Sequence, residues 1–163
     1  MGKVQAYFGN GSPGAVTRSV DDIVISVKNA GTGEIAFGSP VFLGAGGAVP
    51  FNTASPQNFS SFLGFAVRIA DKTPDTYPQD QSGNPQAGCW KPGDVMEVLV
   101  RGGITVSLAA SGTTGGKVYI RKSDGALTAS AGAADSTVLL ENVRIRNSGT
   151  MCCEVVVNQR NLI

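Results

Sequence analysis

The 163-residue sequence contains no histidine. Histidine is the commonest general base in enzymes and the usual partner of serine and cysteine nucleophiles. Because a CxxC motif is also missing, the usual ligands of a structural zinc ion are not there either. The carboxylate pairs, Asp21 with Asp22 and Asp94 with Glu97, stand at a strand entrance and beside a turn, where solvated side chains are expected. We therefore expect no enzyme, no bound metal and no cofactor.

Charged residues are few and nearly balanced. The sequence has 13 Lys and Arg residues and 12 Asp and Glu residues, and its net charge is +1. The basic side chains are scattered, without the patch that a nucleic-acid backbone requires. No apolar run reaches the length of a membrane span, and the opening residues MGKVQAYFGNG lack the apolar core of a signal peptide. We expect no nucleic acid and no membrane among the partners, and synthesis in a reducing cytoplasm.

Cysteine is limited to Cys89, Cys152 and Cys153, an odd number. Neighbouring residues of a strand point to opposite faces, so the adjacent pair does not suggest a disulfide framework. We expect these thiols to be buried and to act as small apolar side chains.

No window repeats apolar residues with helical spacing over three turns, so no substantial helix is predicted. Glycine is abundant, at 22 of 163 residues, and only 7% are aromatic, which favours an all-β protein rich in turns. Short apolar or alternating runs between Gly, Pro and Asn signals indicate about 8 to 10 short strands. The predicted strands are 23–27, 35–43, 48–51, 62–69, 95–101, 104–108, 117–122, 126–128, 137–146 and 152–157. We expect a jelly-roll-like β-sandwich or a small closed barrel, because alternation does not fix the connectivity.

The segment Lys91–Leu108 is the centre of the predicted architecture. Pro92-Gly93-Asp94 has the composition of a turn, and the residues after it alternate between apolar and polar. Gly102-Gly103 interrupts this alternation, and Ile104 resumes it. We predict a hairpin with a tight turn at residues 101–103.

Residues 1–20 have too few apolar side chains to pack by themselves. We expect them to form an extended N-terminal arm, and residues 21–163 to form a single β domain. Tyr7 and Phe8 are candidates for anchoring the arm on a neighbouring subunit, and the alternative is a frayed tail.

Residues 71–90 form the longest irregular stretch, a Pro-rich loop with almost no aliphatic side chains. Loops of this length in compact domains are usually functional or disordered. Its aromatic residues Tyr77 and Trp90 suit an interface, and the alternative is a solvated loop with Trp90 packed under the core.

Four segments occur in an order that resembles a known family. They are AFGSPVFLGAGGAV (Ala36–Val49), LGFAVRIAD (Leu63–Asp71), KPGDVMEVLVRGGITVSL (Lys91–Leu108) and GGKVYIRKSDGALT (Gly115–Thr128), and an apolar final strand follows. Their order and spacing resemble the structural cement, or decoration, proteins of tailed bacteriophages. The longer loop 71–90 and the Cys152-Cys153 pair depart from that pattern.

The resemblance implies a small all-β structural protein on the outer surface of the virion capsid, made in the host bacterial cytoplasm. Its implied partners are the major capsid protein and further copies of itself, as a homodimer or homotrimer that bridges capsomers. The candidate contact residues are Tyr7, Phe8, Tyr77 and Trp90.

Two other functions stay open on the residues alone. A carbohydrate- or peptide-binding β module would use Tyr77 and Trp90 as a stacking platform. A hydrolase would need a metal site built around Asp21, Asp22 or Asp94.

Overall fold

The structure is a computed structural model that describes residues 11–17, 21–69, 88–149 and 152–159. Regular structure in these ranges consists of strands and one short 3-10 turn, η1 (Phe59–Ser61). The strands are β1 (Ile23–Lys28), β2 (Ile35–Ala36), β3 (Pro40–Gly44), β4 (Gly47–Pro50), β5 (Phe62–Ala66), β6 (Cys89–Trp90), β7 (Val95–Ser107), β8 (Lys117–Arg121), β9 (Leu127–Thr128), β10 (Thr137–Asn147) and β11 (Cys152–Val157). None of the described segments is a helix long and apolar enough to cross a membrane. The expected all-β class is confirmed.

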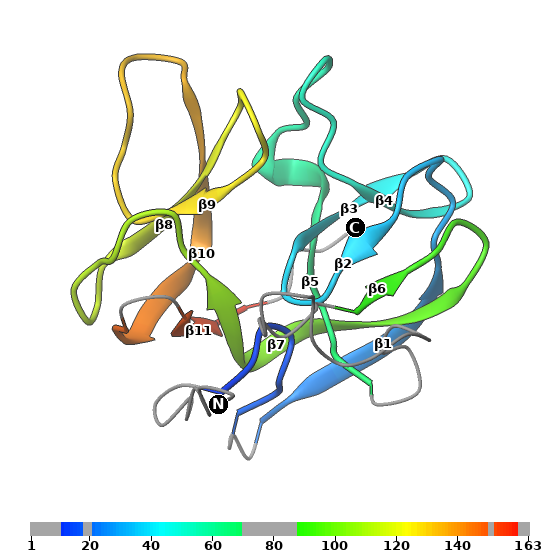
Figure 1. Cartoon of the computed structure of the whole chain (residues 1–163), viewed down its shortest axis with the longest axis horizontal. Helices are drawn as coiled ribbons and strands as arrows, with labels where there is room; N and C mark the ends of the chain where they lie inside the picture. Colours follow the sequence, from blue (N-terminus) through cyan, green and yellow to red (C-terminus); the bar gives the residue numbers. More distant parts are fainter. Residues whose placement is uncertain (1–10, 18–20, 70–87, 150–151, 160–163) are drawn as a thin grey trace, which may run out of the picture.

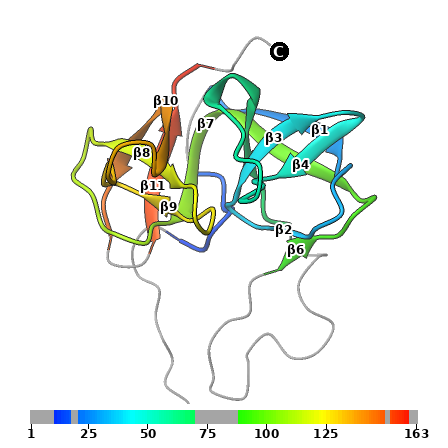
Figure 2. The same ribbon diagram turned by 90° about the horizontal axis from the view of Figure 1, so that it is seen from above.

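Nine of these strands form one antiparallel sheet in the order β4-β3-β5-β7-β11-β10-β8-β9, with β1 also paired to β7. The sheet stays open, with β4 and β9 at the two ends of this order, and is consistent with a sandwich. It folds into two lobes that share β7, as Figures 1 and 2 show. The first lobe contains β1–β6 and the first half of β7, and the second contains the rest of β7 with β8–β11.

The predicted hairpin within Lys91–Leu108 is wrong. β7 runs from Val95 to Ser107 as one strand of 13 residues, and its two halves do not pair with each other. The first half lies between β1 and β5, because Leu99 pairs with both strands. The second half pairs with β11 from Gly102 onward. Alternation showed that both halves are strands, but it did not show which strand each half pairs with.

The two glycines bend β7 instead of reversing it. Gly102 has a φ of +116°, and a Cβ at this position would lie 1.9 Å from Oδ1 of Asp22. The same carboxylate oxygen accepts the N–H of Gly103 at 3.2 Å. Just before the glycines, a register shift between Ile23 and Val24 leaves Val100 as an extra residue of β7, which is a β-bulge. The bend directs the second half of the strand into the second lobe.

Two hydrophobic cores lie on opposite faces of β3, β5 and the first half of β7. The inner core is enclosed by the first lobe alone and contains Ile35, Phe37, Val41, Ala48, Ala66, Trp90, Met96, Val98 and Val100. The shared core lies between the lobes, where Phe42, Phe62, Phe65 and Leu99 meet apolar side chains of β8, β10 and β11. The predicted strand 62–69 is therefore present as β5, which contributes side chains to both cores.

The predicted strand 35–43 is split in the structure. β2 ends at Ala36, the chain turns through Gly38, and β3 begins at Pro40. Pro has no N–H to donate to a ladder, and the first residue of a strand is a position where this loss is tolerated. The other predicted strands are present with small changes at their ends.

Candidate contact surfaces

Residues 11–17, part of the predicted arm, are bonded to the domain itself. The N–H of Gly14 donates to the carbonyl of Thr105 at 2.8 Å, and the N–H of Thr105 donates to Ala15 at 2.9 Å. The N–H of Thr17 donates to the carbonyl of Gly103 at 2.8 Å. This segment therefore continues the sheet along the free side of the second half of β7. Within the predicted 1–20 arm, residues 14–17 are therefore hydrogen-bonded to the β domain.

The segment lies so close to the first lobe that Gly14 has no room for a side chain. A Cβ on Gly14 would lie 2.8 Å from Cβ of Phe37 and 2.9 Å from the backbone nitrogen of Arg68. The Arg68 N–H also donates to the Gly14 carbonyl at 2.8 Å. Residues 11–17 therefore connect both lobes and hold the chain that precedes them at a fixed point.

Of the four predicted contact residues, Tyr7, Phe8 and Tyr77 lie outside the described residues. Trp90 is described, and it is a core residue with 2% of its surface exposed. Its indole N–H donates to the carbonyl of Val67 at 3.0 Å, and its ring meets Phe37 edge-to-face at 6.1 Å. Trp90 therefore corresponds to the alternative in which it packs under the core. The buried ring is not exposed as a surface contact or as a stacking platform in this chain, and the predicted contacts at Tyr7, Phe8 and Tyr77 stay predictions.

The three aspartates proposed for a metal site have separate structural roles. Asp21 forms an ion pair with Arg101 at 3.4 Å. Asp22 accepts the N–H of Gly103 at the bend of β7. Asp94 accepts the backbone N–H of Lys91 at 2.9 Å and closes the predicted turn before β7. Among the described residues, no three His, Cys, Asp or Glu side chains are grouped so that they could hold a metal ion.

The three cysteines are free thiols. Cys153 is buried in the shared core, whereas Cys89 and Cys152 are half-buried. Burial, followed by the neighbouring Cys153, raises the pKa of the Cys152 thiol. Burial, followed by a hydrogen bond with Glu34, raises the pKa of the Cys89 thiol. The expectation of buried thiols is confirmed fully for Cys153.

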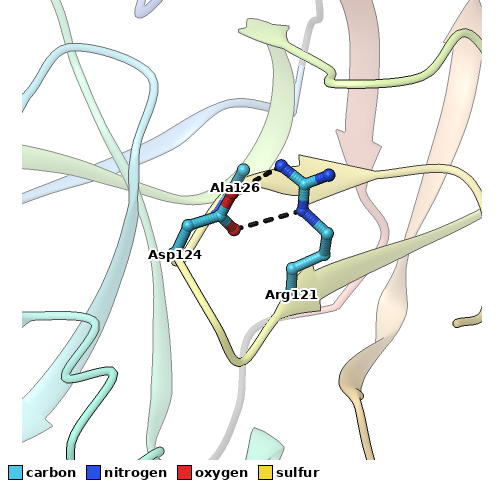
Figure 3. A network of polar contacts seen from close by, with 3 residues as sticks. All are labelled: Arg121, Asp124 and Ala126. Carbon is cyan, nitrogen blue, oxygen red and sulfur yellow. Dashed lines mark hydrogen bonds and ion pairs between the residues drawn. The ribbon is translucent and has the colours of Figure 1, made fainter. Parts of the chain in front are cut away.

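The turn at residues 123–125 joins β8 to β9 and is held by a small polar network (Figure 3). Arg121 donates from Nε and Nη2 to the two carboxylate oxygens of Asp124, which also accepts the N–H of Ala126. The Arg121 side chain, and then the Ala126 N–H, lower the pKa of Asp124. Across the gap between lobes, a Cβ on Gly125 would lie only 3.2 Å from the ring of Phe51. This rigid turn therefore also packs against the first lobe.

Sequence reasoning missed Asn29, which is 1% exposed and fully bonded. Its Nδ2 donates to the carbonyls of Gly33 and Trp90 at 3.1 and 3.2 Å, and its Oδ1 accepts the N–H of Gly31 at 3.1 Å. In the sequence, Asn29-Ala30-Gly31 indicates only the end of a strand. Asn29 instead ties the end of β1 to β6.

Along strand β1, half-buried and exposed side chains alternate. The strand pairs with β7, and beyond its end Asn29 forms a single bridge to Ala48 of β4. Val24 is 41% exposed, and Val95, opposite Lys28 on β7, is 66% exposed. These are the two most exposed large apolar side chains in the described part of the chain.

Comparisons with known proteins complete this description. The family model described as "Structural cement protein (E217 gp24/Pam3 gp6)" matches residues 2–158. Among solved structures, a chain from "The capsid of Myoviridae Phage XM1" is similar with a TM-score of 0.73 over 98% of both chains. Its sequence identity is 18%, so this likeness shows a shared fold. No curated protein matches the sequence.

The family match extends across both lobes, from the residues before the segment 11–17 to the end of β11. It includes the motifs on which the resemblance to cement proteins was based. The chain belongs to the structural cement protein family.

Proposed function

We propose that this protein binds the outer surface of a bacteriophage capsid and stabilises the contacts between capsomers. The observation that carries the proposal is membership of the structural cement family over residues 2–158. The fold that the chain shares with a chain of a myovirus capsid structure supports it. The proposed partners are the major capsid protein and further copies of this chain, as a homodimer or homotrimer.

The architecture suits such a role. Shared β7, the shared core and the segment 11–17 join both lobes, so a load applied to one lobe is transmitted to the other. Many weak contacts to a repeating lattice add up strongly when each copy is rigid, because little conformational entropy is lost on binding. The core position of Trp90 also removes this ring from a surface platform for a small ligand.

Tyr7, Phe8 and Tyr77 are the proposed contact residues. Residues 1–10 precede a segment that is fixed on β7, and ten residues span at most about 33–36 Å when fully extended. That reach is enough to touch a neighbouring subunit. Large aromatic side chains commonly dominate the energetics of such contacts.

Co-sedimentation with bare capsids tests the proposal. We expect saturable binding at a fixed ratio to the major capsid protein. Deleting Gly2–Asn10 should raise the apparent Kd at least ~30-fold, which corresponds to the loss of one or two aromatic anchors. The deletion stops before Gly11, so the bonds that residues 11–17 make to β7 are kept.

Tyr77→Ala and Tyr77→Phe form a matched pair, because only the first removes the ring. If the ring makes the contact, Tyr77→Ala weakens binding and Tyr77→Phe does not. Absence of any saturable binding by the full chain would contradict the capsid role. Undiminished binding by the deleted chain and by Tyr77→Ala would contradict the assignment of the contacts.

A further inference from the structure

Among the described residues, none covers the outer edge of β1 along its middle. The strand reads IVISVK, with alternating half-buried and exposed side chains. At its end, the bridge between Asn29 and Ala48 and the hydrogen bond from Ala30 to Ala48 bring β4 alongside. Residues 23–27 have no such neighbour among the described residues. Figure 1 shows β1 at the margin of the first lobe.

The register of the β1–β7 pairing shows which backbone groups of β1 point away from β7. The Glu97 carbonyl accepts the N–H of Val67 at 2.9 Å, so the backbone polar groups of Glu97 point away from β1. Ser26 is opposite Glu97, and in an antiparallel ladder such a pair is not hydrogen-bonded. The N–H and C=O of Ser26 therefore point outward. By the alternation of a strand, those of Val24 do so too.

The odd-numbered positions of β1 confirm this assignment. The N–H of Asn29 donates to Asp94 at 2.8 Å, and the Asn29 carbonyl accepts the N–H of Gly93 at 2.8 Å. Position 29 therefore faces the chain that leads into β7, as do positions 25 and 27 of the same parity. The described residues supply no hydrogen bond to the outward groups of Val24 and Ser26.

Natural proteins protect exposed edge strands with proline, with charged side chains or with a covering segment. The uncovered stretch 23–27 contains neither proline nor charge, and its residues are Ile, Val, Ile, Ser and Val. Ile23, Ile25 and Val27 pack on the inner core but stay half-exposed. A second apolar strand beside them would cover these side chains and satisfy the outward backbone groups.

We propose that β1 pairs antiparallel with β1 of a second copy, around a two-fold axis between the two Ile25 residues. The axis follows from the uncovered stretch 23–27, whose centre is Ile25. Val24 of each copy then pairs with Ser26 of the other, which forms about four backbone hydrogen bonds. Such an isologous contact uses the same surface on both copies.

Charge favours a second copy in this orientation. β1 is preceded by Asp21 and Asp22 and ends with Lys28. Antiparallel pairing places the acidic start of each strand beside the basic end of the other, whereas parallel pairing would place the two Lys28 side chains side by side. Opposite charges across a strand pair are favourable and like charges are not. The contact is small, so we expect a weak dimer that becomes significant at the high local concentration on a lattice.

This inference deepens the proposed function and rests on it for the biological role of the dimer, but it is tested on the free protein. Analytical ultracentrifugation of the full chain should show a monomer–dimer equilibrium below ~1 mM. Ser26→Pro removes an outward N–H without removing a bond to β7, and it should raise the dimer Kd about tenfold or more. Ser26→Ala keeps that N–H and should leave the dimer unchanged. Circular dichroism checks that both variants stay folded.

A disulfide trap tests the register. Two cysteines introduced by Ile25→Cys would face each other in a non-hydrogen-bonded pair, with Cα atoms about 4.5 Å apart. Mild oxidation should therefore link the copies. Val27→Cys is the matched control on the same face of β1, and its two cysteines would lie about 13 Å apart, too far to bond.

Each outcome decides the matter. A monomer at all concentrations, a trimer, or a dimer unaffected by Ser26→Pro would overturn the proposal. Equal cross-linking of the Ile25→Cys and Val27→Cys variants would overturn the register. Loss of the dimer in Ser26→Pro, with capsid co-sedimentation retained at saturating protein, would separate this contact from capsid binding itself.

Discussion

Replacing Asn29 by Asp should destabilise the protein strongly, although the two side chains have nearly the same shape. Nδ2 of Asn29 donates to the carbonyls of Gly33 and Trp90, and only 1% of the residue is exposed. In Asn29→Asp a carboxylate oxygen takes the place of this donor and faces two carbonyl oxygens. The bond from the Gly31 N–H to Oδ1 is kept.

The magnitude follows from the two lost donors. Each net hydrogen bond contributes about 1 kcal/mol, and leaving a buried polar group poorly satisfied costs about 1–3 kcal/mol, which here applies to the introduced carboxylate oxygen. A buried carboxylate without a cation adds to this cost. We expect the free energy of unfolding to fall by about 3–5 kcal/mol at neutral pH.

The pH dependence has a definite sign. Burial beside two carbonyls should raise the pKa of the introduced carboxyl in the folded state above its value in the unfolded chain. A raised folded-state pKa means that the variant recovers stability as the pH falls and loses it as the pH rises through that pKa. Wild type lacks this carboxyl, so the difference between the two proteins should shrink in acid.

Urea unfolding followed by the fluorescence of the single tryptophan measures this effect, because Trp90 is buried beside the altered site. With a slope of about 2 kcal/mol per molar urea, the midpoint should fall by about 2 M. Asn52→Asp is the matched control. Oδ1 of Asn52 accepts the N–H groups of Ala54 and Ser55 in an exposed turn, and the same substitution keeps both bonds. A loss in Asn29→Asp no larger than in the control, or one that does not depend on pH, would refute the reasoning.

Three further predictions concern other parts of the fold. Gly102→Ala should lower the free energy of unfolding by about 2–4 kcal/mol, because the new side chain combines a positive φ with a clash. Gly46→Ala is also at positive φ but in open space, and it should cost only about 1 kcal/mol. Equal losses in urea unfolding would contradict this role for the β7 bend. An NMR titration should give Asp124 a pKa below the ordinary 3.8. The stabilisation that its carboxylate gives the turn is then lost as the pH falls through that lowered pKa. Arg121→Gln should return the pKa of Asp124 toward 3.8. In the native protein, the three thiols should react slowly with a thiol reagent at neutral pH. All three should react after unfolding. Rapid labelling of all three in the native protein would contradict their burial.

The sequence predicted the strands well because a strand is recorded in local alternation. Val118 and Ile120 of β8 are both buried as expected, and β10 and β11 occupy the segments predicted for them. Turn chemistry was equally local, and the turns at Pro92-Gly93-Asp94 and at residues 123–125 are present. The family resemblance depended on the order of such local motifs, and it is confirmed over nearly the whole chain.

Local patterns could not predict which strands pair with one another. Gly102-Gly103 is compatible with a hairpin turn or with a bend, and the difference depends on Asp22, which is 80 positions earlier. Segment 11–17 appeared too polar to pack, but its backbone bonds to β7 instead of its side chains hold it in place. Backbone hydrogen bonding leaves no mark in the residue types, so local patterns could not reveal this contact.

The contact residues show the same division. By itself the sequence determined that this is an all-β chain of a structural family, because composition, alternation and motif order carry that information. Only the tertiary structure decided that Trp90 is a core residue, that Asn29 is a buried link and that no other described strand pairs with the outer edge of β1 at its middle. Burial and edge position depend on which strands meet across long distances in the chain, and that is a property of the assembled sheet.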